Sequence, residues 1–240
     1  MIELFAGIGS QTQALKNAGV EHENVAISEI DSYAIQSYEY LHGPVKNLGD
    51  ISLIDPASAP DCDLITYSFP CQDLSLAGKR NGMEKGSGTR SGLLWEVERL
   101  LNECTQLPQI LLMENVPQVH GSKNKEHFDK WIEFLASKGY SNHWRDLNAK
   151  DYEIPQSRNR CFMVSILGNY SYNFPSPIPL GKRLRDVMEH KVDERFYLRP
   201  EQVNRLLSVP KGSHGPTLLN ENSDFARTIT TRVGNSGTYE

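Results

Sequence analysis

The chain has 240 residues, of which 38% are hydrophobic and 23% are charged, and its formal net charge is -5 at pH 7. This length suffices for one large core, or for one large domain and part of a second. The negative charge argues against a protein that coats nucleic acid, but it allows a local basic face. No apolar run approaches membrane-spanning length and residues 1–7 are not a signal peptide, so we predict a cytoplasmic protein with no membrane contact.

The cysteines and histidines give no indication of a metal site or of disulfides. Cys62, Cys71, Cys104 and Cys161 form no Cys-x-x-Cys pair, and the histidines show no ligand spacing. The sequence therefore predicts free thiols in a reducing compartment and no metal site.

The first part of the chain predicts a strand at residues 2–5, a glycine turn, a helix, and a second strand at residues 25–30 that contains Glu29. This order is typical of the nucleotide-binding half of a doubly wound sheet, in which the acid accepts hydrogen bonds from ribose hydroxyls. The turn has Gly7 and Gly9 but no third glycine, so the dinucleotide pattern is incomplete. An adenosyl ligand without a pyrophosphate would not need the third glycine, and a tight turn without any ligand is the alternative.

Two helices are predicted on either side of this second strand, and each is expected to bury an apolar face. The first should end at Gly19 and the second should cover residues 32–41. The expected apolar contributors are Ala14, Leu15 and Ala18 in the first helix, and Tyr33, Ile35, Tyr38 and Leu41 in the second.

A short apolar strand at residues 45–48 leads to Asp50 and Ile51. At the carboxyl edge of the sheet, the Asp50 carboxylate could bind an adenine amino group. The alternative is that Asp50 caps a turn or a helix.

The next predicted strand covers residues 64–69 and ends at Pro70, because proline cannot extend a central ladder. The first side chain after that turn is the thiol of Cys71. A lone free cysteine is usually a small buried apolar group, but here a glycine-rich basic segment follows at residues 78–92. A cysteine at a strand end before such a segment favours contact with a polyanion. The basic residues of this segment are Lys79, Arg80, Lys85 and Arg90.

Residues 109–116 predict a strand that is apolar on both faces and ends in Glu114 and Asn115. A buried acid is costly to ionise without a partner, so we expect Glu114 at the ligand edge of the sheet. Farther along, Arg158 and Arg160 alternate, so they face the same side of an extended backbone. The other elements predicted here are helices at residues 93–101 and 128–135 and strands at residues 140–147 and 161–167.

Strands and helices alternate to about residue 168, which predicts an α/β protein with one parallel-rich sheet covered by helices on both faces. Residues 174–179 then form a proline-rich linker, and short helices are predicted at residues 182–185 and 200–207. From Lys211 onward the chain is polar and has no core of its own. The predicted domains are therefore residues 1–178 and residues 179–240, of which the second is incomplete.

Taken together, these motifs resemble the cytosine-C5 DNA methyltransferases of bacterial restriction–modification systems and their phages. The matches occur in the family's order and span roughly residues 2–167. The resemblance implies a Rossmann-like S-adenosylmethionine-dependent methyltransferase sheet with a smaller target-recognition region. It also implies S-adenosyl-L-methionine as cofactor, duplex DNA as partner, and a cognate restriction endonuclease in the host. The matching segments are residues 5–9, Glu29, residues 49–51, residues 69–72, residues 114–116 and residues 156–160.

The resemblance also implies the roles of individual residues. Cys71 would be the nucleophile that adds to cytosine C6, Glu114 would bind or protonate N3, Arg160 would hold O2, and Arg158 would support this pocket or a phosphate. The cofactor-binding residues it implies are Phe5, Ala6, Gly7, Gly9, Glu29, Ile30, Asp50, Ile51 and Pro70. The DNA-binding residues it implies are Gln72, Ser75, Lys79, Arg80, Arg90 and Gln156.

Two elements of the family are absent. One is an Arg/Thr/Pro-containing segment after the recognition region, and the other is a C-terminal Gly-Asn-Ser followed by an apolar helix. Residues 234–236 are Gly-Asn-Ser, but the chain stops four residues later. We therefore expect either a fragment of a longer enzyme or one subunit whose remainder a second polypeptide supplies. In both cases residues 1–240 should not methylate a specific site alone.

Two other functions stay open at this point. One is the RNA-directed branch of the same family, which would methylate tRNA with the same cysteine and cofactor. The other is a non-catalytic DNA-binding or regulatory subunit. The basic segment at residues 182–185 favours DNA over tRNA, and the presence of Cys71, Glu114 and Arg160 favours an enzyme.

Overall fold

The computed structural model describes residues 1–70, 90–208, 219 and 223–228. The chain divides into two compact units, Met1–Leu147 with Arg160–Phe174, and Asn148–Asn159 with Pro175–Glu240. The regular elements of the first unit are β1 (Ile2–Leu4), α1 (Ser10–Asn17), β2 (Ala26–Ser28), α2 (Ser32–His42), β3 (Leu64–Tyr67), α3 (Leu94–Glu103), β4 (Ile110–Asn115), α4 (Lys125–Ser137), β5 (Tyr140–Asn148) and β7 (Asn159–Leu167).

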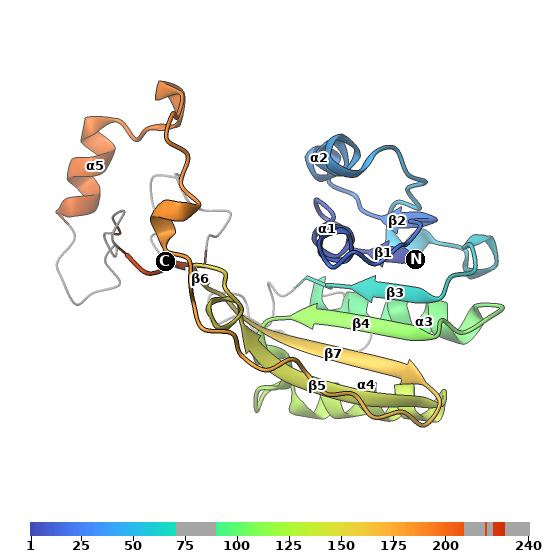
Figure 1. Ribbon diagram of the computed structural model, residues 1–240. Coiled ribbons are helices and arrows are strands. Elements are labelled where there is room, and N and C mark those ends of the chain that lie inside the picture. Colours follow the sequence, from blue (N-terminus) through green and yellow to red (C-terminus); the bar gives the residue numbers. More distant parts are fainter. Residues whose placement is uncertain (71–89, 209–218, 220–222, 229–240) are drawn as a thin grey trace. The chain divides into compact units, whose positions relative to one another are not determined.

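A six-stranded sheet with the order β2-β1-β3-β4-β7-β5 organises the first unit (Figure 1). The neighbours among β2, β1, β3 and β4 are parallel, whereas β7 runs antiparallel to β4 with Asn115 opposite Cys161. Carboxyl ends of parallel strands meet at one edge, which is where ligands bind in open α/β sheets. The segments that follow β1, β2, β3 and β4 therefore share this edge, and the amino end of β7 reaches it too.

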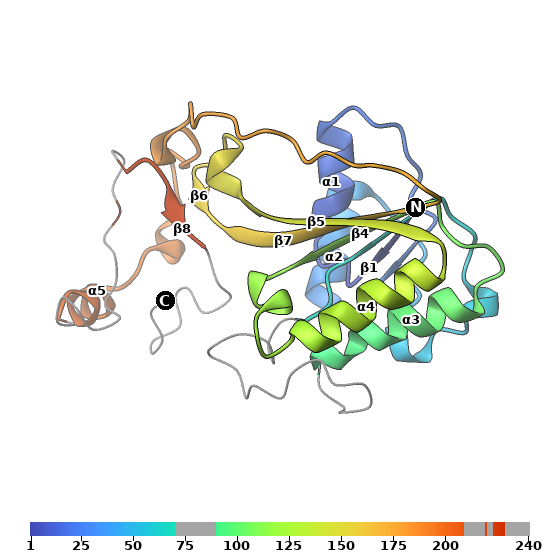
Figure 2. The same cartoon turned by 90° about the horizontal axis from the view of Figure 1, so that it is seen from below.

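Helices cover both faces of this sheet, which confirms the predicted fold class. Helices α1 and α2 lie on one face, and α3 and α4 lie on the other (Figures 1 and 2). The α3–α4 face holds most of the apolar core, because both helices repeat large apolar residues at helical spacing. The core residues of these two helices are Leu94, Val97, Leu100, Leu101, Phe128, Trp131 and Leu135.

The α1–α2 face differs from its prediction, because the side chains it buries are partly polar. In α1 the buried residue is Thr12, whereas the expected Ala14 and Ala18 are exposed and Leu15 is only half-buried. In α2 the buried residue is Tyr38, while Tyr33 and Leu41 are exposed.

Two short predicted elements are also different in the structure. Residues 45–48 were predicted as a strand, but they join β2 only through a single bridge between Ile27 and Asn47. Gly49 follows with a left-handed φ of 75°, which turns the chain away from the ladder. The predicted helix at residues 182–185 is instead a short 3-10 turn, Leu184–Asp186, whose Asp186 carboxylate accepts a hydrogen bond from the Arg183 amide.

The second unit contains little regular structure in the part that is described. The predicted helix at residues 200–207 is confirmed as α5 (Pro200–Leu207), and Gln156 pairs in parallel with Ala226. The other elements of this unit are the 3-10 turns Ala149–Asp151, Leu184–Asp186 and Glu194–Phe196 and the strands β6 (Gln156–Ser157) and β8 (Ala226–Arg227).

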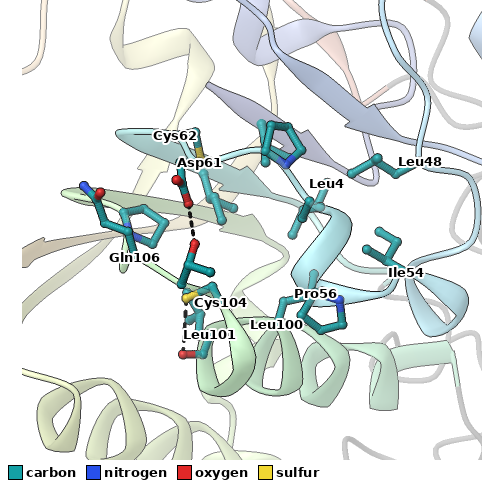
Figure 3. A pocket seen from close by; sticks show the side chains of 16 residues that line it. Leu4, Leu48, Ile54, Pro56, Asp61, Cys62, Leu100, Leu101, Cys104 and Gln106 are labelled. Atoms are coloured by element: carbon teal, nitrogen blue, oxygen red, sulfur yellow. Dashed lines mark hydrogen bonds between the residues drawn. The ribbon is translucent and has the colours of Figure 1, made fainter.

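A mainly apolar pocket in the first unit lies at the end of the sheet opposite to the carboxyl edge. Figure 3 shows Leu4, Cys62, Leu100 and Cys104 among the side chains that line it. Cys62 precedes β3 and Cys104 follows α3, so the pocket adjoins the amino ends of the strands. None of the helices in the described part of the chain is both long and apolar enough to cross a bilayer.

Candidate active site

The turn after β1 holds its backbone in a left-handed conformation at three positions, Phe5, Gly7 and Gly9, with φ values of 56°, 55° and 83°. Gly9 packs against α2, because a Cβ built there would lie 2.5 Å from the ring of His42. Around Gly7, by contrast, no atom of the described residues comes within 4 Å of such a Cβ. The two glycines therefore have different structural roles. Gly9 allows α2 to pack closely against the turn, and Gly7 leaves space beside the turn.

A buried acid on β1 anchors the helix that follows this turn. The Glu3 side chain accepts hydrogen bonds from the Thr12 hydroxyl at 2.6 Å and from the Gln11 amide at 3.3 Å. Thr12 also contacts the hydroxyl of Tyr38, and Asn24 donates to both Thr12 and Tyr38. Burial raises the pKa of Glu3, although the bonds from Thr12 and Gln11 act in the opposite direction.

Sequence reasoning missed this polar network. The available signal was the charge of Glu3 between two apolar residues of a buried strand. A carboxylate in such a position needs donors, and the exposed amides at a helix N-terminus supply them.

Glu29 connects the end of β2 to the glycine turn. One carboxylate oxygen accepts from the Gly7 amide at 2.8 Å, and the other accepts from the amides of Ile30 and Asp31. The Ile30 side chain beside it is 73% exposed. This geometry fixes the carboxylate at the edge where a ligand would meet the turn, with an exposed apolar side chain next to it.

In the structure Asp50 caps the turn that follows it, which is the second of the two roles expected from the sequence. Its Oδ1 accepts hydrogen bonds from the amide and the hydroxyl of Ser52 at 2.9 and 2.8 Å. Ile51 is buried, and its carbonyl accepts from an Arg99 guanidinium nitrogen at 2.9 Å. The role of Asp50 and Ile51 toward a cofactor stays a prediction.

The end of β3 is tied to its neighbours by two side-chain bonds that the sequence did not indicate. Asn115 at the end of β4 donates to the carbonyl oxygen of Phe69 at 3.0 Å, and the Asn115 side chain is buried. Gln11 in α1 donates to the hydroxyl of Ser68 at 2.8 Å. Both bonds restrain the segment immediately before the half-buried Pro70, one through the Phe69 carbonyl and the other through the Ser68 side chain.

Glu114 and Arg160 form an ion pair at the same edge of the sheet. The Arg160 Nε lies 3.0 Å from Oε1 of Glu114, and the two side chains are only 17% and 21% exposed. The antiparallel register makes this possible, because Glu114 lies opposite Phe162 and Arg160 stands two residues before it on the same face. The pair therefore joins a carboxylate and a guanidinium in a largely desolvated position.

Two of the predicted site residues belong to the second unit. The backbone amide of Arg158 donates to the Asn148 side chain at 3.0 Å. Gln156 lies on β6 and donates to the carbonyl of Arg227 at 3.5 Å. Arg158 belongs to one unit and Arg160 to the other, so the predicted common facing of the two arginines stays a prediction.

The remaining predicted residues fall wholly or partly outside the description. Cys71, Gln72, Ser75, Lys79 and Arg80 all lie outside the described residues. Arg90 opens the 3-10 turn Arg90–Leu93, but its side chain is outside the description.

Comparison with known proteins gives one consistent family. A family model described as C-5 cytosine-specific DNA methylase matches residues 1–233. The chain is 37% identical over 258 residues to the type II methyltransferase M2.ScrFI of Lactococcus lactis subsp. cremoris, an alignment that covers 85% of this chain and 71% of the relative. It is 34% identical over 247 residues to the type II methyltransferase M.NlaX of Neisseria lactamica, with 99% and 76% covered.

A solved structure supports the same fold. The S. pombe Dnmt2 methyltransferase superposes with a TM-score of 0.76 at 25% sequence identity, over 98% of this chain and 71% of that one.

Proposed function

Because the chain belongs to the family of C-5 cytosine-specific DNA methylases, we propose that it transfers a methyl group from S-adenosyl-L-methionine to C5 of a flipped-out cytosine in a specific duplex DNA sequence. The main support for the proposal is the Glu114–Arg160 ion pair, which brings together the two groups that would bind the cytosine ring. The pair lies at the sheet edge that also bears the glycine turn and Pro70.

The residues at this edge suit an adenosyl cofactor. Gly7 leaves space for a ligand beside the turn, and Glu29 presents a carboxylate there that is already fixed by three amides. Ile30 offers an exposed apolar surface for the adenine ring, and Asp50 offers a carboxylate at the start of the 3-10 turn Ile51–Leu53. We assign the cofactor to these residues together with Phe5, Ala6, Gly9, Ile51 and Pro70.

The chemistry needs transient activation of the cytosine ring, because C5 alone is a weak nucleophile. The thiolate of Cys71 donates an electron pair to C6 and forms a carbon–sulfur bond, which gives C5 the electron density to bond to the methyl carbon. S-adenosylmethionine, when bound, supplies that methyl group as the electrophile. Loss of the C5 proton to a base such as water and expulsion of Cys71 then restore the aromatic ring.

Glu114 and Arg160 bind the target cytosine rather than the cofactor. Glu114 binds or protonates N3 and so withdraws electrons from C6 as the thiolate adds. Arg160 donates to O2, and its ion pair with Glu114 keeps the two groups next to each other. Arg158 supports this pocket or a flanking phosphate.

DNA recognition is assigned to the segment after Cys71 and to the second part of the chain. Gln72, Ser75, Lys79, Arg80, Arg90 and Gln156 would contact DNA. The target cytosine is stacked inside the duplex, so its extrusion costs free energy that contacts to the displaced strand must offset. In this proposal residues 1–178 carry catalysis and residues 179–240 contribute to target recognition.

The decisive experiment traps the covalent adduct. Duplex DNA with 5-fluorocytosine at the target should form a stable adduct, because fluorine cannot leave as the C5 proton does. Peptide mapping should find the adduct on Cys71, and a Cys71→Ala protein should form none. Cys104→Ala is the matched control, since it removes a cysteine far along the chain and should leave adduct formation unchanged. An adduct formed by Cys71→Ala would contradict the proposal.

The substrate is tested separately. Methyl transfer to duplex DNA of random sequence is compared with transfer to tRNA, and 5-methylcytosine is mapped at base resolution. We expect modified cytosines in DNA within one sequence context. Transfer to tRNA alone would favour the RNA-directed branch, and the absence of any transfer despite cofactor binding would favour a regulatory subunit.

A further inference from the structure

Three side chains of types that bind metals converge in the first unit, on the face of the sheet covered by α4. His120 ends the 3-10 turn Pro117–His120, which follows β4, while Asp146 lies on β5 and Cys161 lies on β7. Their ligand atoms all lie within 4.8 Å of one another. The Nε2 atom of His120 is 3.0 Å and 3.1 Å from the two carboxylate oxygens of Asp146.

We propose that His120, Asp146 and Cys161 bind a zinc ion. Imidazole nitrogen, carboxylate oxygen and thiolate are the three ligand types that zinc takes in proteins. Magnesium and calcium prefer sites made only of oxygen, so the thiolate selects against them. Three protein ligands leave one position of a tetrahedron for water.

The separations are compatible with this coordination. Zinc–ligand bonds of about 2.0–2.3 Å in a tetrahedron place the ligand atoms roughly 3.3–3.7 Å apart. His120 and Asp146 are already near that spacing. Closing the site requires the Cys161 sulfur to approach by no more than about 1.5 Å, which small side-chain rotations can supply.

The surroundings of the three ligands hold them in place and leave an entry path. The imidazole of His120 lies against Trp144 at a ring-centroid distance of 4.6 Å and against Phe128 of α4 at 6.0 Å. Cys161 is fully buried in the ladder with β4, whereas the side chains of His120 and Asp146 are 24% and 31% exposed. An ion can therefore reach a site whose two outer ligands are accessible and whose inner ligand is buried.

The balance of charge also favours a cation here. Without a metal, the fully buried thiol of Cys161 lies within 4.8 Å of a carboxylate oxygen of Asp146. A divalent ion with one thiolate, one carboxylate and a neutral imidazole gives a site of zero net charge, which costs least in a buried position. Binding would release the thiol proton.

A zinc ion at this position would fasten parts of the chain next to the candidate active site. Cys161 directly follows Arg160, and it lies opposite Asn115, which holds the Phe69 carbonyl. The ion would therefore join β5, β7 and the turn after β4 beside the Glu114–Arg160 pair. The competing arrangement is a metal-free trio in which Asp146 only accepts hydrogen bonds from His120 and Cys161.

Cobalt(II) is the probe that separates the two arrangements, because cobalt bound to a thiolate gives a charge-transfer absorption in the near ultraviolet. The titration uses residues 1–240 in a Cys71→Ala background, so that the band cannot come from the proposed nucleophile. We expect one equivalent of cobalt to produce the thiolate band together with the visible absorption of a tetrahedral site, and zinc to displace it.

Variants locate the ligands. Cys161→Val, which keeps an apolar side chain of similar volume, should abolish the thiolate band. His120→Asn and Asp146→Asn should weaken binding by more than about 100-fold, since even outer groups around a metal alter affinity 10- to 100-fold. Cys104→Val is the matched control and should bind as the parent does. A parent protein without the band, or a band that persists in Cys161→Val, would overturn the proposal.

A measurement on the unaltered chain removes any dependence on how well the variants fold. Zinc should protect Cys161 from alkylation, as read by mass mapping of the modified peptides, and should raise the melting temperature. Alkylation of Cys161 at the same rate with and without zinc, without any thermal shift, would also refute the metal site. Cys62 and Cys104 serve as internal references, and zinc should leave their alkylation rates unchanged.

Discussion

Arg160 holds Glu114 across the β4–β7 ladder through a contact of 3.0 Å between Nε and Oε1. The two residues come from strands that run in opposite directions, so their contact depends on the register of the sheet rather than on a local turn. Each side chain sets the orientation of the other. In the proposed reaction, the carboxylate at N3 and the guanidinium at O2 therefore act as one unit.

Glu114→Gln should separate catalysis from cofactor binding. Glutamine keeps the size and one oxygen acceptor for Arg160, but it removes the charge and the titratable carboxyl proton. Methyl transfer should slow on the order of 10²–10⁴-fold, the usual share of a general acid, while cofactor affinity stays near that of the parent. Single-turnover kinetics and calorimetry measure the two effects.

The matched variant for Glu114→Gln is Glu29→Ala. It should weaken cofactor binding by about 1–3 kcal/mol, the cost of losing a hydrogen-bonded partner. A cofactor-binding defect in Glu114→Gln together with unchanged binding in Glu29→Ala would show that the two roles are assigned the wrong way round.

Asn115→Ala should affect both stability and turnover. The variant leaves the carbonyl of Phe69 without its side-chain donor in a buried position, which costs about 1–3 kcal/mol of unfolding free energy. The backbone before Pro70 also loses one of its two side-chain ties, so methyl transfer should slow more than cofactor binding weakens. Urea unfolding and steady-state kinetics check the two effects, and the exposed Asn102→Ala should change neither.

Glu3→Gln should change how stability depends on pH. Burial raises the pKa of Glu3 above its ordinary value of 4.5, so the folded chain binds this proton more tightly than the unfolded chain does. The contribution of the Glu3 carboxyl group to the free energy of unfolding is present in full below pH 4.5, and it is lost as the pH rises through the folded-state pKa. Relative to Glu3→Gln, the parent should therefore lose unfolding free energy as the pH rises above 4.5.

Urea titrations at a series of pH values measure this difference. The exposed Glu103→Gln is the control, and it should keep the pH dependence of the parent. A constant difference between parent and Glu3→Gln across the series would contradict the prediction.

Gly9→Ala should destabilise the chain much more than Gly7→Ala. Both positions have a left-handed φ, which costs a residue with a Cβ about 1–2 kcal/mol. At Gly9 the new methyl would also lie 2.5 Å from the His42 ring and 2.8 Å from Tyr38. Adding His42→Ala should recover part of the Gly9→Ala loss but none of the Gly7→Ala loss, as a double-mutant cycle measures. Equal costs at the two glycines would refute the packing role of Gly9.

The sequence predicted the sheet well because its central strands are short apolar runs with clear stops. Pro70 marks the end of β3. The acids Glu29 and Glu114 mark the ends of their strands, because a charged side chain buried in the middle of a strand would be costly. These are local signals. The prediction of the buried face of α1 was wrong, because Thr12 is buried through its hydrogen bond to Glu3. Glu3 lies on another element, so local periodicity does not reveal this partner.

Contacts between neighbouring strands were not indicated by the sequence either. The Arg160–Glu114 pair and the bond from Asn115 to Phe69 depend on which strands are neighbours and in which register. The same reason explains why the sequence did not indicate the cluster that we propose to bind zinc: 26 positions separate His120 from Asp146 along the chain. Spacing rules detect ligands on one helix or loop, whereas these three side chains come together only in the sheet.

The left-handed backbone of Phe5 has a kinetic consequence for ligand capture. A residue with a side chain adopts this conformation only when its surroundings compensate, and Phe5 packs against the core of the first unit. Folding therefore sets the shape of the glycine turn before any ligand arrives, and the loss of backbone entropy there belongs to folding rather than to binding. Association at this turn should then proceed in one concentration-dependent phase, without a slower ordering step behind it.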